Sequence, residues 1–314
     1  MRDNFYYLLG IGFFILFIVG GIFYLAVRPK TESLSFQSNF VFQSPVPTYP
    51  LVTYLPLNLL SSPKDFPKTL ELQAESALLF DLTNERSLFE KKPEKKLLIA
   101  SLTKLMTALV ASENVSSKNQ RFFVLDEDLK IENPYGDLKS GDNFNLEEAL
   151  HFVLIRSDNV LAQVLARSVF PENSKFFAFE MNKRAQQLGM QNTLYYDSIG
   201  LENNLSTAMD LKNLVEEILK SHQEIFLISK IPEIKVISPE NKVFSLKNTN
   251  VLVSKIPGIF GSKTGFTPEA AGSLLVVFKD GAKMVLTVVL GSQDRFGDTS
   301  DLINWYWKNR QDWQ

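Results

Sequence analysis

The chain has 314 residues, 45 % of them hydrophobic and 22 % charged, a composition typical of a globular protein with one large or two medium cores. With 33 basic and 35 acidic side chains, the net charge of −2 gives no electrostatic reason to expect a nucleic acid partner. The absence of cysteine from the sequence excludes disulfides, thiolate metal ligands and a cysteine nucleophile.

An uncharged run of 23 residues, 5–27, follows a short N-terminal flank, 1–4. About 20 apolar residues suffice to cross a bilayer as a helix, so this run is long enough for a transmembrane anchor. A cleaved signal peptide has a shorter apolar region and a cleavage site of small residues, which "FYLAVRPK" does not offer. We therefore expect an uncleaved anchor, and its nearly balanced flanking charges do not predict its orientation.

The next segment, 28–70, contains seven of the 14 prolines of the chain. Proline is disfavoured in helices and in central strands, so we expect an extended tether. Regular patterning begins after the tether, and residues 71–314 are interpreted as one folded domain.

The patterning of this domain predicts two strands around a polar turn, then mainly helices, and finally a hairpin with Asp280 and Gly281 at its turn. A polar break, "RSDN", separates two of the helices, and Ser206 or Thr207 is expected to cap a later one. The predicted strands lie within 76–92 and 272–292, and the predicted helices within 100–112, 145–170, 173–189, 206–222 and 298–313. Strands at both ends predict an α/β (α+β) domain whose sheet is completed by the C-terminal hairpin.

A candidate nucleophile, Ser101, stands at the start of the helix within 100–112, and Lys104 follows three residues later. On a helix, residues at i and i+3 project to one face, one turn apart. A serine needs a base, and neither His151 nor His222 has a triad or metal-ligand pattern around it, so the lysine is the candidate base. Taken alone, the spacing is more typical of a capping serine and a solvated lysine.

Two further motifs could contribute to the same site. The Ser-Asp-Asn motif at 157–159 occupies the polar break, where a hydroxyl and an amide can turn outward together; alone, it is typical of a stabilised turn. The sequence Lys263, Thr264, Gly265 lies on a strand that enters the final hairpin. Its glycine lets a substrate backbone lie close, and its side chains offer a cation and a hydroxyl.

In this order and in these settings, the three motifs are the signature of penicillin-binding proteins and serine β-lactamases. The stretches "FEKKPEKKLLIASLTKLMTALVA", "LKSGDNFNLEEALHFVLIRSDNVLAQVLA" and "GSKTGFTPEAAGSLL" resemble D-alanyl-D-alanine carboxypeptidases of the low-molecular-mass penicillin-binding type, the S11 serine peptidases. The resemblance covers about residues 75–292. It implies a β-lactamase/transpeptidase-like fold, with an antiparallel sheet flanked by helices and a mainly helical subdomain.

The resemblance also implies a mechanism. Ser101 is expected to attack the carbonyl between the two terminal D-alanines of a peptidoglycan stem peptide, giving an acyl-enzyme. Lys104, kept neutral by burial and by the positive Lys263, is expected to take the hydroxyl proton. Ser157, held by Asn159, is expected to pass a proton to the leaving amine.

The remaining expected contacts bind the substrate. The resemblance implies that Lys263, Thr264 and the neighbouring Gly265 bind the terminal carboxylate and admit the substrate backbone. The backbone N–H groups of Ser101 and Phe266 are expected to form the oxyanion hole. No metal or cofactor is required, and β-lactams are expected to be covalent inhibitors.

Three features depart from many family members: a β-rich C-terminal domain is not expected, the anchor is N-terminal, and Ser198 stands where the family usually has proline. Because the substrate lies outside the cytoplasm, the resemblance predicts a single-pass membrane protein with an extracytoplasmic catalytic domain. The lysine-rich stretch 91–96 is interpreted as a solvated turn.

Three other functions remain open. A D-alanyl-D-alanine endopeptidase acting on cross-linked peptidoglycan would use the same scaffold. A class A-like β-lactamase would need a Glu-x-x-Leu-Asn loop, from which residues 202–206, "ENNLS", differ by the final serine. An inactive wall-binding module would keep the pocket, although every chemical side chain is present.

Overall fold

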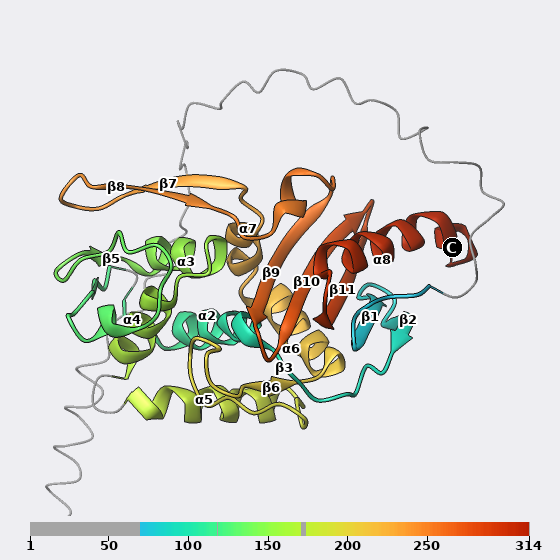
Figure 1. Cartoon of the computed structure of the whole chain (residues 1–314), viewed down its shortest axis with the longest axis horizontal. Coiled ribbons are helices and arrows are strands. Elements are labelled where there is room, and N and C mark those ends of the chain that lie inside the picture. The colour runs from blue at the N-terminus through green and yellow to red at the C-terminus, as the bar shows by residue number, and fades with distance from the viewer. Residues whose placement is uncertain (1–69, 118, 171–173, 314) are drawn as a thin grey trace, which may run out of the picture. The chain divides into compact units, whose positions relative to one another are not determined.

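The computed structural model describes residues 70–117, 119–170 and 174–313 (Figure 1). The predicted anchor, its flank and all of the tether before Leu70 lie outside the described residues. Within the described part, no helix has both the length and the apolar character needed to cross a membrane.

The predicted helices and strands occur in the predicted order along the chain, but the short helix Glu224–Ser229 and the hairpin within 233–247 were not predicted. The strands of the main sheet are β1 (Ser76–Asp81), β2 (Arg86–Lys91), β9 (Ile259–Thr267), β10 (Ala271–Asp280) and β11 (Lys283–Ser292). The α-helices are α2 (Thr103–Asn114), α3 (Leu146–Ile155), α4 (Asn159–Val169), α5 (Ser174–Gln187), α6 (Ala208–Ser221), α7 (Glu224–Ser229) and α8 (Arg295–Asn309). Short strands are β3 (Leu97–Leu98), β4 (Phe122–Phe123), β5 (Asn143–Phe144), β6 (Leu205–Ser206), β7 (Glu233–Ile237) and β8 (Val243–Lys247). Four 3-10 turns complete the chain: η1 (Ala100–Leu102), η2 (Asp128–Lys130), η3 (Val251–Ser254) and η4 (Arg310–Trp313).

The five-stranded sheet is antiparallel, with the strand order β2-β1-β11-β10-β9. Asp280 pairs with Lys283 at the end of the last hairpin, and Gly281 takes the left-handed conformation (φ 60°) that its turn requires. The C-terminal hairpin therefore completes the sheet begun by β1, as predicted. The topology leaves β9 as an edge strand.

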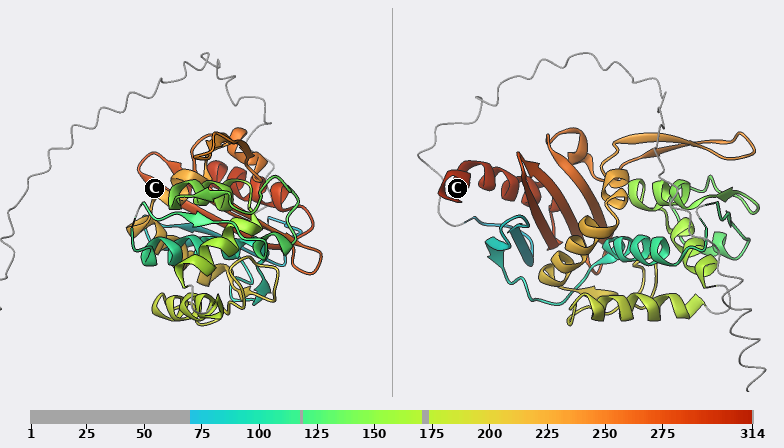
Figure 2. Two further views of the ribbon diagram at one scale, coloured as in Figure 1. Left: turned by 90° about the vertical axis from the view of Figure 1, so that its left-hand side faces the viewer. Right: turned by 180° about the vertical axis from the view of Figure 1, so that it is seen from behind.

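Both faces of this sheet are buried. Successive side chains of a strand point to opposite faces, so alternate residues of one strand enter two different cores. On β10, Leu275 and Val277 join the core that includes the helices α2 to α7, whereas Leu274, Val276 and Phe278 pack in a second core against α8. Figures 1 and 2 show α8 at one side of the sheet and the helical subdomain (α2 to α5) at the other. The edge strand β9 lies at the junction with this subdomain.

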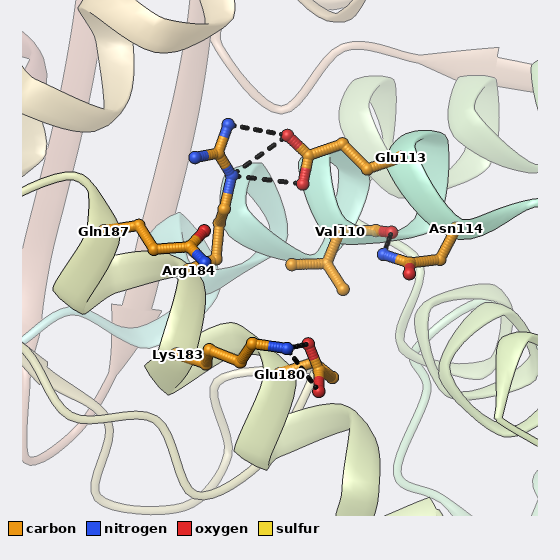
Figure 3. Close-up of a pocket in the computed structure, with 7 residues that line it drawn as sticks. All are labelled: Val110, Glu113, Asn114, Glu180, Lys183, Arg184 and Gln187. Carbon is orange, nitrogen blue, oxygen red and sulfur yellow. Dashed lines mark hydrogen bonds and ion pairs between the residues drawn. The ribbon is translucent and has the colours of Figure 1, made fainter.

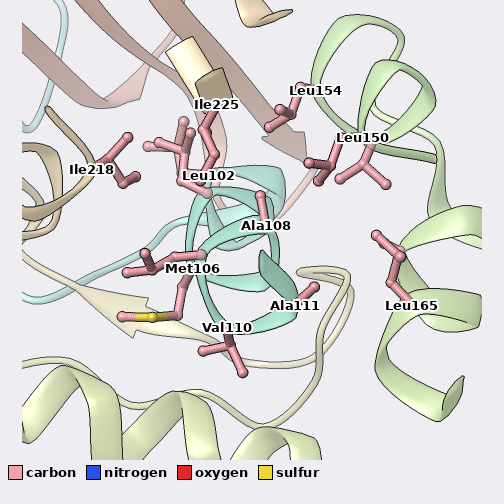
Figure 4. Close-up of a cluster of buried hydrophobic side chains, with 14 of the residues drawn as sticks. Leu102, Met106, Ala108, Val110, Ala111, Leu150, Leu154, Leu165, Ile218 and Ile225 are labelled. Carbon is pink, nitrogen blue, oxygen red and sulfur yellow. The ribbon is translucent and has the colours of Figure 1, made fainter. Parts of the chain in front are cut away.

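The helix α2 lies at the centre of the larger core. The sequence predicted one apolar stripe on it, but every side chain from Thr103 to Ala111 is buried. Figure 4 shows why: side chains of α3, α4, α6 and α7, among them Leu150, Leu165 and Ile218, surround this helix. A helix that is enclosed on all sides is a rigid platform for groups at its N-terminus.

Capping side chains delimit the other helices that shape the site. Asp158 accepts a hydrogen bond from Leu161 N and begins α4, so the "RSDN" stretch separates α3 from α4 as predicted. Thr207 rather than Ser206 caps α6. The Asp158 cap places Ser157 outside α4 and makes Asn159 the first residue of that helix.

The first described residues fasten the N-terminal end of the domain to α8. The backbone N–H groups of Gln73 and Ala74 donate to the carboxylate of Asp298, at 2.9 and 2.7 Å. Ser292 Oγ donates to the same carboxylate at 2.5 Å. We call residues 70–75 the strap; it joins β1 to the end of the sheet where β11 meets α8.

Candidate active site

Ser101 lies in the turn η1, which leads directly into α2. The residue before it, Ala100, has a left-handed backbone (φ 45°), a conformation that is unfavourable for a residue with a Cβ atom. Ser101 itself is partly exposed. The turn therefore presents a hydroxyl at the N-terminal end of the central helix, as the sequence predicted.

Lys104 is completely buried one turn further along. Its Nζ donates to Ser101 Oγ at 2.9 Å, to Asn159 Oδ1 at 2.8 Å and to the carbonyl oxygen of Ile199 at 2.8 Å. The first and second motifs thus meet at one ammonium group, which is within proton-transfer distance of the serine.

Burial lowers the pKa of Lys104 from its usual 10.5 to about 7, although Asp158 and Asp197 favour the charged form. Near neutral pH a large fraction of this lysine is unprotonated and can accept the hydroxyl proton of Ser101. Burial was one of the two causes predicted for a neutral Lys104. The other, the charge of Lys263, is not among the causes of this lowered pKa.

Lys263 brings the third motif to the same place from β9. Its side chain is buried, and Nζ donates to Ser157 Oγ at 2.8 Å and to the carbonyl oxygen of Thr264 at 2.9 Å. Burial lowers the pKa of Lys263, and the positive charges of Lys104 and Arg295 lower it further. The site therefore disfavours two simultaneous ammonium charges.

The contact expected between Ser157 and Asn159 differs from the one observed. Ser157 is bound by Lys263, whereas Asn159 accepts from Lys104 and donates through Nδ2 to the carbonyl oxygen of Glu132 at 2.7 Å. Ser157 has a left-handed backbone (φ 62°) outside α4, and Asn159 is the first residue of that helix. The two side chains consequently leave the chain in different directions and reach different lysines.

Two glycines let backbone close around the serine from both sides. A Cβ atom on Gly265 would lie 2.6 Å from the carbonyl oxygen of Ile99 and 3.3 Å from Ser101 N. A Cβ atom on Gly200 (φ 91°) would lie 2.0 Å from the carbonyl oxygen of Ala100. Both glycines are required by these close approaches. The turn η1 is thus packed between β9 and the loop that carries Gly200.

Thr264, which is expected to bind the substrate carboxylate together with Lys263, has a hydrogen-bond partner that the motifs did not indicate. Its hydroxyl forms a 2.7 Å hydrogen bond with the hydroxyl of Thr249. The backbone N–H of Thr249 donates to the carbonyl oxygen of Ile155 at 2.9 Å, just before the 157–159 motif. Thr249 therefore links the second and third motifs.

Arg295 is a second residue that the sequence analysis missed. Its guanidinium stands 5.6 Å from the ring centroid of Phe266 and 4.7 Å from that of Phe296, and its Nε is buried without a hydrogen-bond partner. Its charge contributes to the lowered pKa of Lys263, so the two cations lie near enough to repel one another. The hairpin topology could have located it, because β11 ends beside the start of β10, where Phe266 pairs with Gly272.

A cavity of about 320 Å³ opens beside this cluster. It is bounded by Ala100, next to the nucleophile, by residues 200–203, and by Thr267, Glu269 and Ala270 at and just after the end of β9. A ligand that extends beyond the reacting group along β9 has room there.

A second hollow, of about 240 Å³, lies between α2 and α5 and shares no lining residue with the three motifs. Figure 3 shows that its charges pair with one another: Arg184 binds Glu113 and Lys183 binds Glu180. Because these ions are mutually satisfied, the hollow offers no free charge to a ligand from them.

The other titratable groups singled out in the sequence have structural partners. His151 Nδ1 lies 2.7 Å from the carbonyl oxygen of Glu147 within α3, and His222 pairs with Glu224. Lys91 Nζ donates to the carbonyl oxygen of Leu72. In the described part of the chain, no group of three His, Cys, Asp or Glu side chains could hold a metal ion.

Comparison with known proteins gives the class that this fold and site define. The family model of the S11 peptidases, described as D-alanyl-D-alanine carboxypeptidase, matches residues 63–294. The chain belongs to this family. Its fold is the penicillin-binding, transpeptidase-like fold, as predicted: penicillin-binding protein D2 of Listeria monocytogenes, solved with bound ampicillin, is 28 % identical with a TM-score of 0.67, over 76 % of this chain and 98 % of that one.

Among curated relatives, D-alanyl-D-alanine carboxypeptidase DacF of Bacillus subtilis is 29 % identical over 237 residues, which are 73 % of this chain and 60 % of that protein. A D-alanyl-D-alanine endopeptidase of Haemophilus influenzae is 33 % identical over 213 residues, which are 67 % of this chain and 72 % of that protein. The chain thus spans 60 % of the length of the Bacillus carboxypeptidase and 72 % of the length of the endopeptidase.

Proposed function

We propose that this chain is a serine D-alanyl-D-alanine carboxypeptidase, which removes the terminal D-alanine of peptidoglycan stem peptides and is acylated by penicillins. The observation that carries the proposal is the buried Lys104, whose Nζ lies 2.9 Å from Ser101 Oγ and whose pKa is lowered to about 7. Family membership supports the substrate class.

In the first step Ser101 Oγ bonds to the carbonyl carbon between the two D-alanines, and neutral Lys104 takes the hydroxyl proton. The carbonyl oxygen becomes an anion, which the backbone N–H groups of Ser101 and Phe266 stabilise. Each such donor is worth about 3 kcal/mol in the transition state. The close approach of Gly265 to Ser101 N supports this pairing of β9 with η1.

In the second step the C–N bond breaks and the leaving amine of D-alanine takes a proton from Ser157 Oγ. Lys263, which hydrogen-bonds Ser157 at 2.8 Å, replaces that proton. The proton that Lys104 took from Ser101 then restores Lys263 through solvent, so that Lys104 is neutral again. Water attacks the acyl ester while Lys104 accepts its proton, and that proton passes to Ser101 Oγ as the ester bond breaks.

The free carboxylate of the last D-alanine binds where positive charge converges. Lys263, Thr264 and Arg295 all face this region, and Arg295 adds a planar guanidinium suited to a carboxylate. The preceding residues of the stem peptide then run along the edge strand β9 toward the cavity beside Ala100.

The 202–206 loop does not favour the β-lactamase alternative. Asn204 is buried and accepts a hydrogen bond from Tyr196 N, while its Nδ2 donates to Thr103 Oγ1. Glu202 has an exposed side chain, and its backbone N–H donates to Asp197. The loop is therefore organised as a structural turn rather than around a glutamate that activates water.

A D-alanyl-D-alanine endopeptidase is the second candidate function. It is favoured because relatives bearing that name reach 31 % identity in Pseudomonas aeruginosa and 33 % in Haemophilus influenzae. The same nucleophile and lysines would cleave a cross-link, in which the leaving amine belongs to a second stem peptide.

We further infer an extracytoplasmic location. In this arrangement residues 5–27 anchor the chain, 28–70 form the tether and 71–314 carry the catalytic domain outside the membrane. The charge-free run and the peptidoglycan substrate support it. Protease added to intact cells should digest the domain; digestion only after lysis would contradict the location.

The deciding experiment mixes residues 62–314 with benzylpenicillin and follows intact mass, with Ser101→Ala as the control. We expect a persistent adduct of one penicillin that the control lacks. Diacetyl-Lys-D-Ala-D-Ala and a cross-linked muropeptide, compared as substrates, then separate the carboxypeptidase from the endopeptidase. Hydrolysed penicillin without a lasting adduct would indicate a β-lactamase, and no reaction at all would indicate a binding module.

A further inference from the structure

The residue before the second motif, Arg156, is buried and makes four hydrogen bonds to two carboxylates. Its Nε and one terminal nitrogen donate to Asp158 Oδ2 at 3.1 and 2.8 Å. Both terminal nitrogens also donate to Asp137, at 2.7 and 2.9 Å. The guanidinium therefore joins the residue that follows Ser157 to a separate segment, 132–137.

Aromatic contacts hold the same guanidinium in place. Its central carbon lies 4.3 Å from the ring centroid of Tyr135 and 4.7 Å from that of Phe152. The hydroxyl of Tyr135 donates to the backbone carbonyl oxygen of Arg156 at 2.6 Å. Side chain and backbone of this arginine are thus fixed together.

Asp158, the partner, is fully buried and has every oxygen engaged. Oδ1 accepts from Leu161 N at the start of α4, and Oδ2 accepts from Arg156 and from Asn133 Nδ2. A buried carboxylate is stable only with such partners, so the Arg156–Asp158 bridge is a fixed element and not a mobile surface pair.

Ser157 stands between these two residues and has a left-handed backbone, with φ 62°. This conformation is unfavourable for a residue with a Cβ atom and persists only where the surroundings enforce it. The bridge from residue 156 to residue 158 spans Ser157 and closes a ring around it. In this conformation Ser157 Oγ reaches Lys263 Nζ.

We propose that Arg156 is a positioning residue, which clamps Ser157 in the left-handed conformation and so aims its hydroxyl at the leaving amine. The inference rests on the proposed function. Without the clamp, Ser157 relaxes toward a right-handed backbone, its hydroxyl leaves Lys263, and the transfer of a proton to the leaving group fails first.

This role predicts a selective loss of activity. A peptide has an amine leaving group that needs the proton, whereas the matching thioester, in which a mercapto acid replaces the last D-alanine, expels a thiolate that does not. For Arg156→Met we expect kcat/KM to fall about 100-fold on the peptide and no more than about threefold on the thioester, since general acid catalysis is worth about 10²-fold or more.

Arg167→Met is the matched control. Arg167 lies on α4 and, like Arg156, bridges a buried aspartate, Asp128, at 2.8 Å, but it touches none of the three motifs. In this variant kcat/KM should fall less than about threefold on either substrate, because breaking the ion pair affects the stability of the protein and not the site. Arg156→Lys, which keeps the charge, should recover part of the peptide activity.

Equal losses on peptide and thioester, or unchanged peptide activity in folded Arg156→Met, would overturn the clamp. If circular dichroism shows that Arg156→Met does not fold, Asp137→Asn is used instead. This change removes the charge of the half-exposed partner of Arg156. It should also lower kcat/KM more on the peptide than on the thioester, by a smaller factor than Arg156→Met. If the wild-type enzyme cleaves neither substrate, the proposed function fails. The clamp is then decided by benzylpenicillin, whose ring amine also needs a proton: equal acylation rates for Arg156→Met and Arg167→Met would reject it.

Discussion

The chemistry proposed for this site depends on the protonation of one residue, Lys104. Only its neutral form can accept the proton of Ser101, and burial lowers its pKa to about 7. Acylation by benzylpenicillin should therefore be slow at about pH 5.5, rise through neutrality and level off at about pH 8.5. Stopped-flow acylation rates across this range test the prediction. A rate that falls with rising pH, or one that is constant, would show that a different group is the base.

Arg295 carries the second prediction at the residue scale. If its guanidinium binds the substrate carboxylate, Arg295→Gln should raise KM for a D-Ala-D-Ala peptide about tenfold, the usual size of one charge-assisted contact, and leave kcat nearly unchanged. Arg310→Gln makes the same exchange at the other end of α8, where Arg310 pairs with Asp280, and should leave KM unchanged. The same rise in KM in both variants would indicate a general charge effect.

Among elements, the packing of η1 against β9 positions the nucleophile beside the third motif. Gly265→Ala would place a Cβ atom 2.6 Å from the carbonyl oxygen of Ile99, so turn and strand must separate. A displacement near 1 Å costs about 100-fold in rate, and we expect acylation to slow by about that factor. Ser262→Ala, a change in the same strand that removes a buried hydroxyl without a partner, is the control and should acylate normally. Normal acylation of Gly265→Ala would mean that this contact is not needed.

Most elements could be predicted from the sequence because their signals are local. Periodicity marked the helices, and Asp280-Gly281 marked the hairpin that the sheet requires. The assembly of the site could not be read in the same way. The hydrogen bond between Ser157 and Lys263 joins residues 106 positions apart, and nothing around Thr249 distinguishes it until the chain is folded.

The central helix shows a related limit. A stripe predicts which face of a helix is buried, but every side chain of α2 from Thr103 to Ala111 is buried because α3, α4, α6 and α7 pack around this part of it. Burial of Lys104 follows from this tertiary arrangement and not from its own neighbours in sequence. Motif spacing could identify Lys104 as a candidate base, whereas the cause of its lowered pKa required the fold.

At the scale of the whole molecule, hydrogen bonds between the strap and α8 join the N-terminal and C-terminal ends of the domain. Asp298→Ala would leave the N–H groups of Gln73 and Ala74 without their acceptor, one of them fully buried. We expect the free energy of unfolding to fall by about 3 kcal/mol, as for unsatisfied buried donors, with the acylation rate of the folded protein unchanged. Urea unfolding measures this, with the exposed Asn304→Ala on the same helix as control. Equal free energies of unfolding for the wild type and Asp298→Ala would show that the hydrogen bonds between the strap and Asp298 contribute nothing.

The strap also determines how mechanical load enters the enzyme. Tension applied to the chain before Leu70 enters the described domain there. The first hydrogen bonds to bear it are the one from Lys91 Nζ to the carbonyl oxygen of Leu72 and those from Gln73 N and Ala74 N to Asp298. Once they yield, the force passes to β1, which is held on both sides by β2 and β11. The strand order then places β10 between this loaded region and β9, which carries Lys263. An enzyme pulled by its N-terminal segment in a growing wall would thus lose its strap well before its active site is distorted.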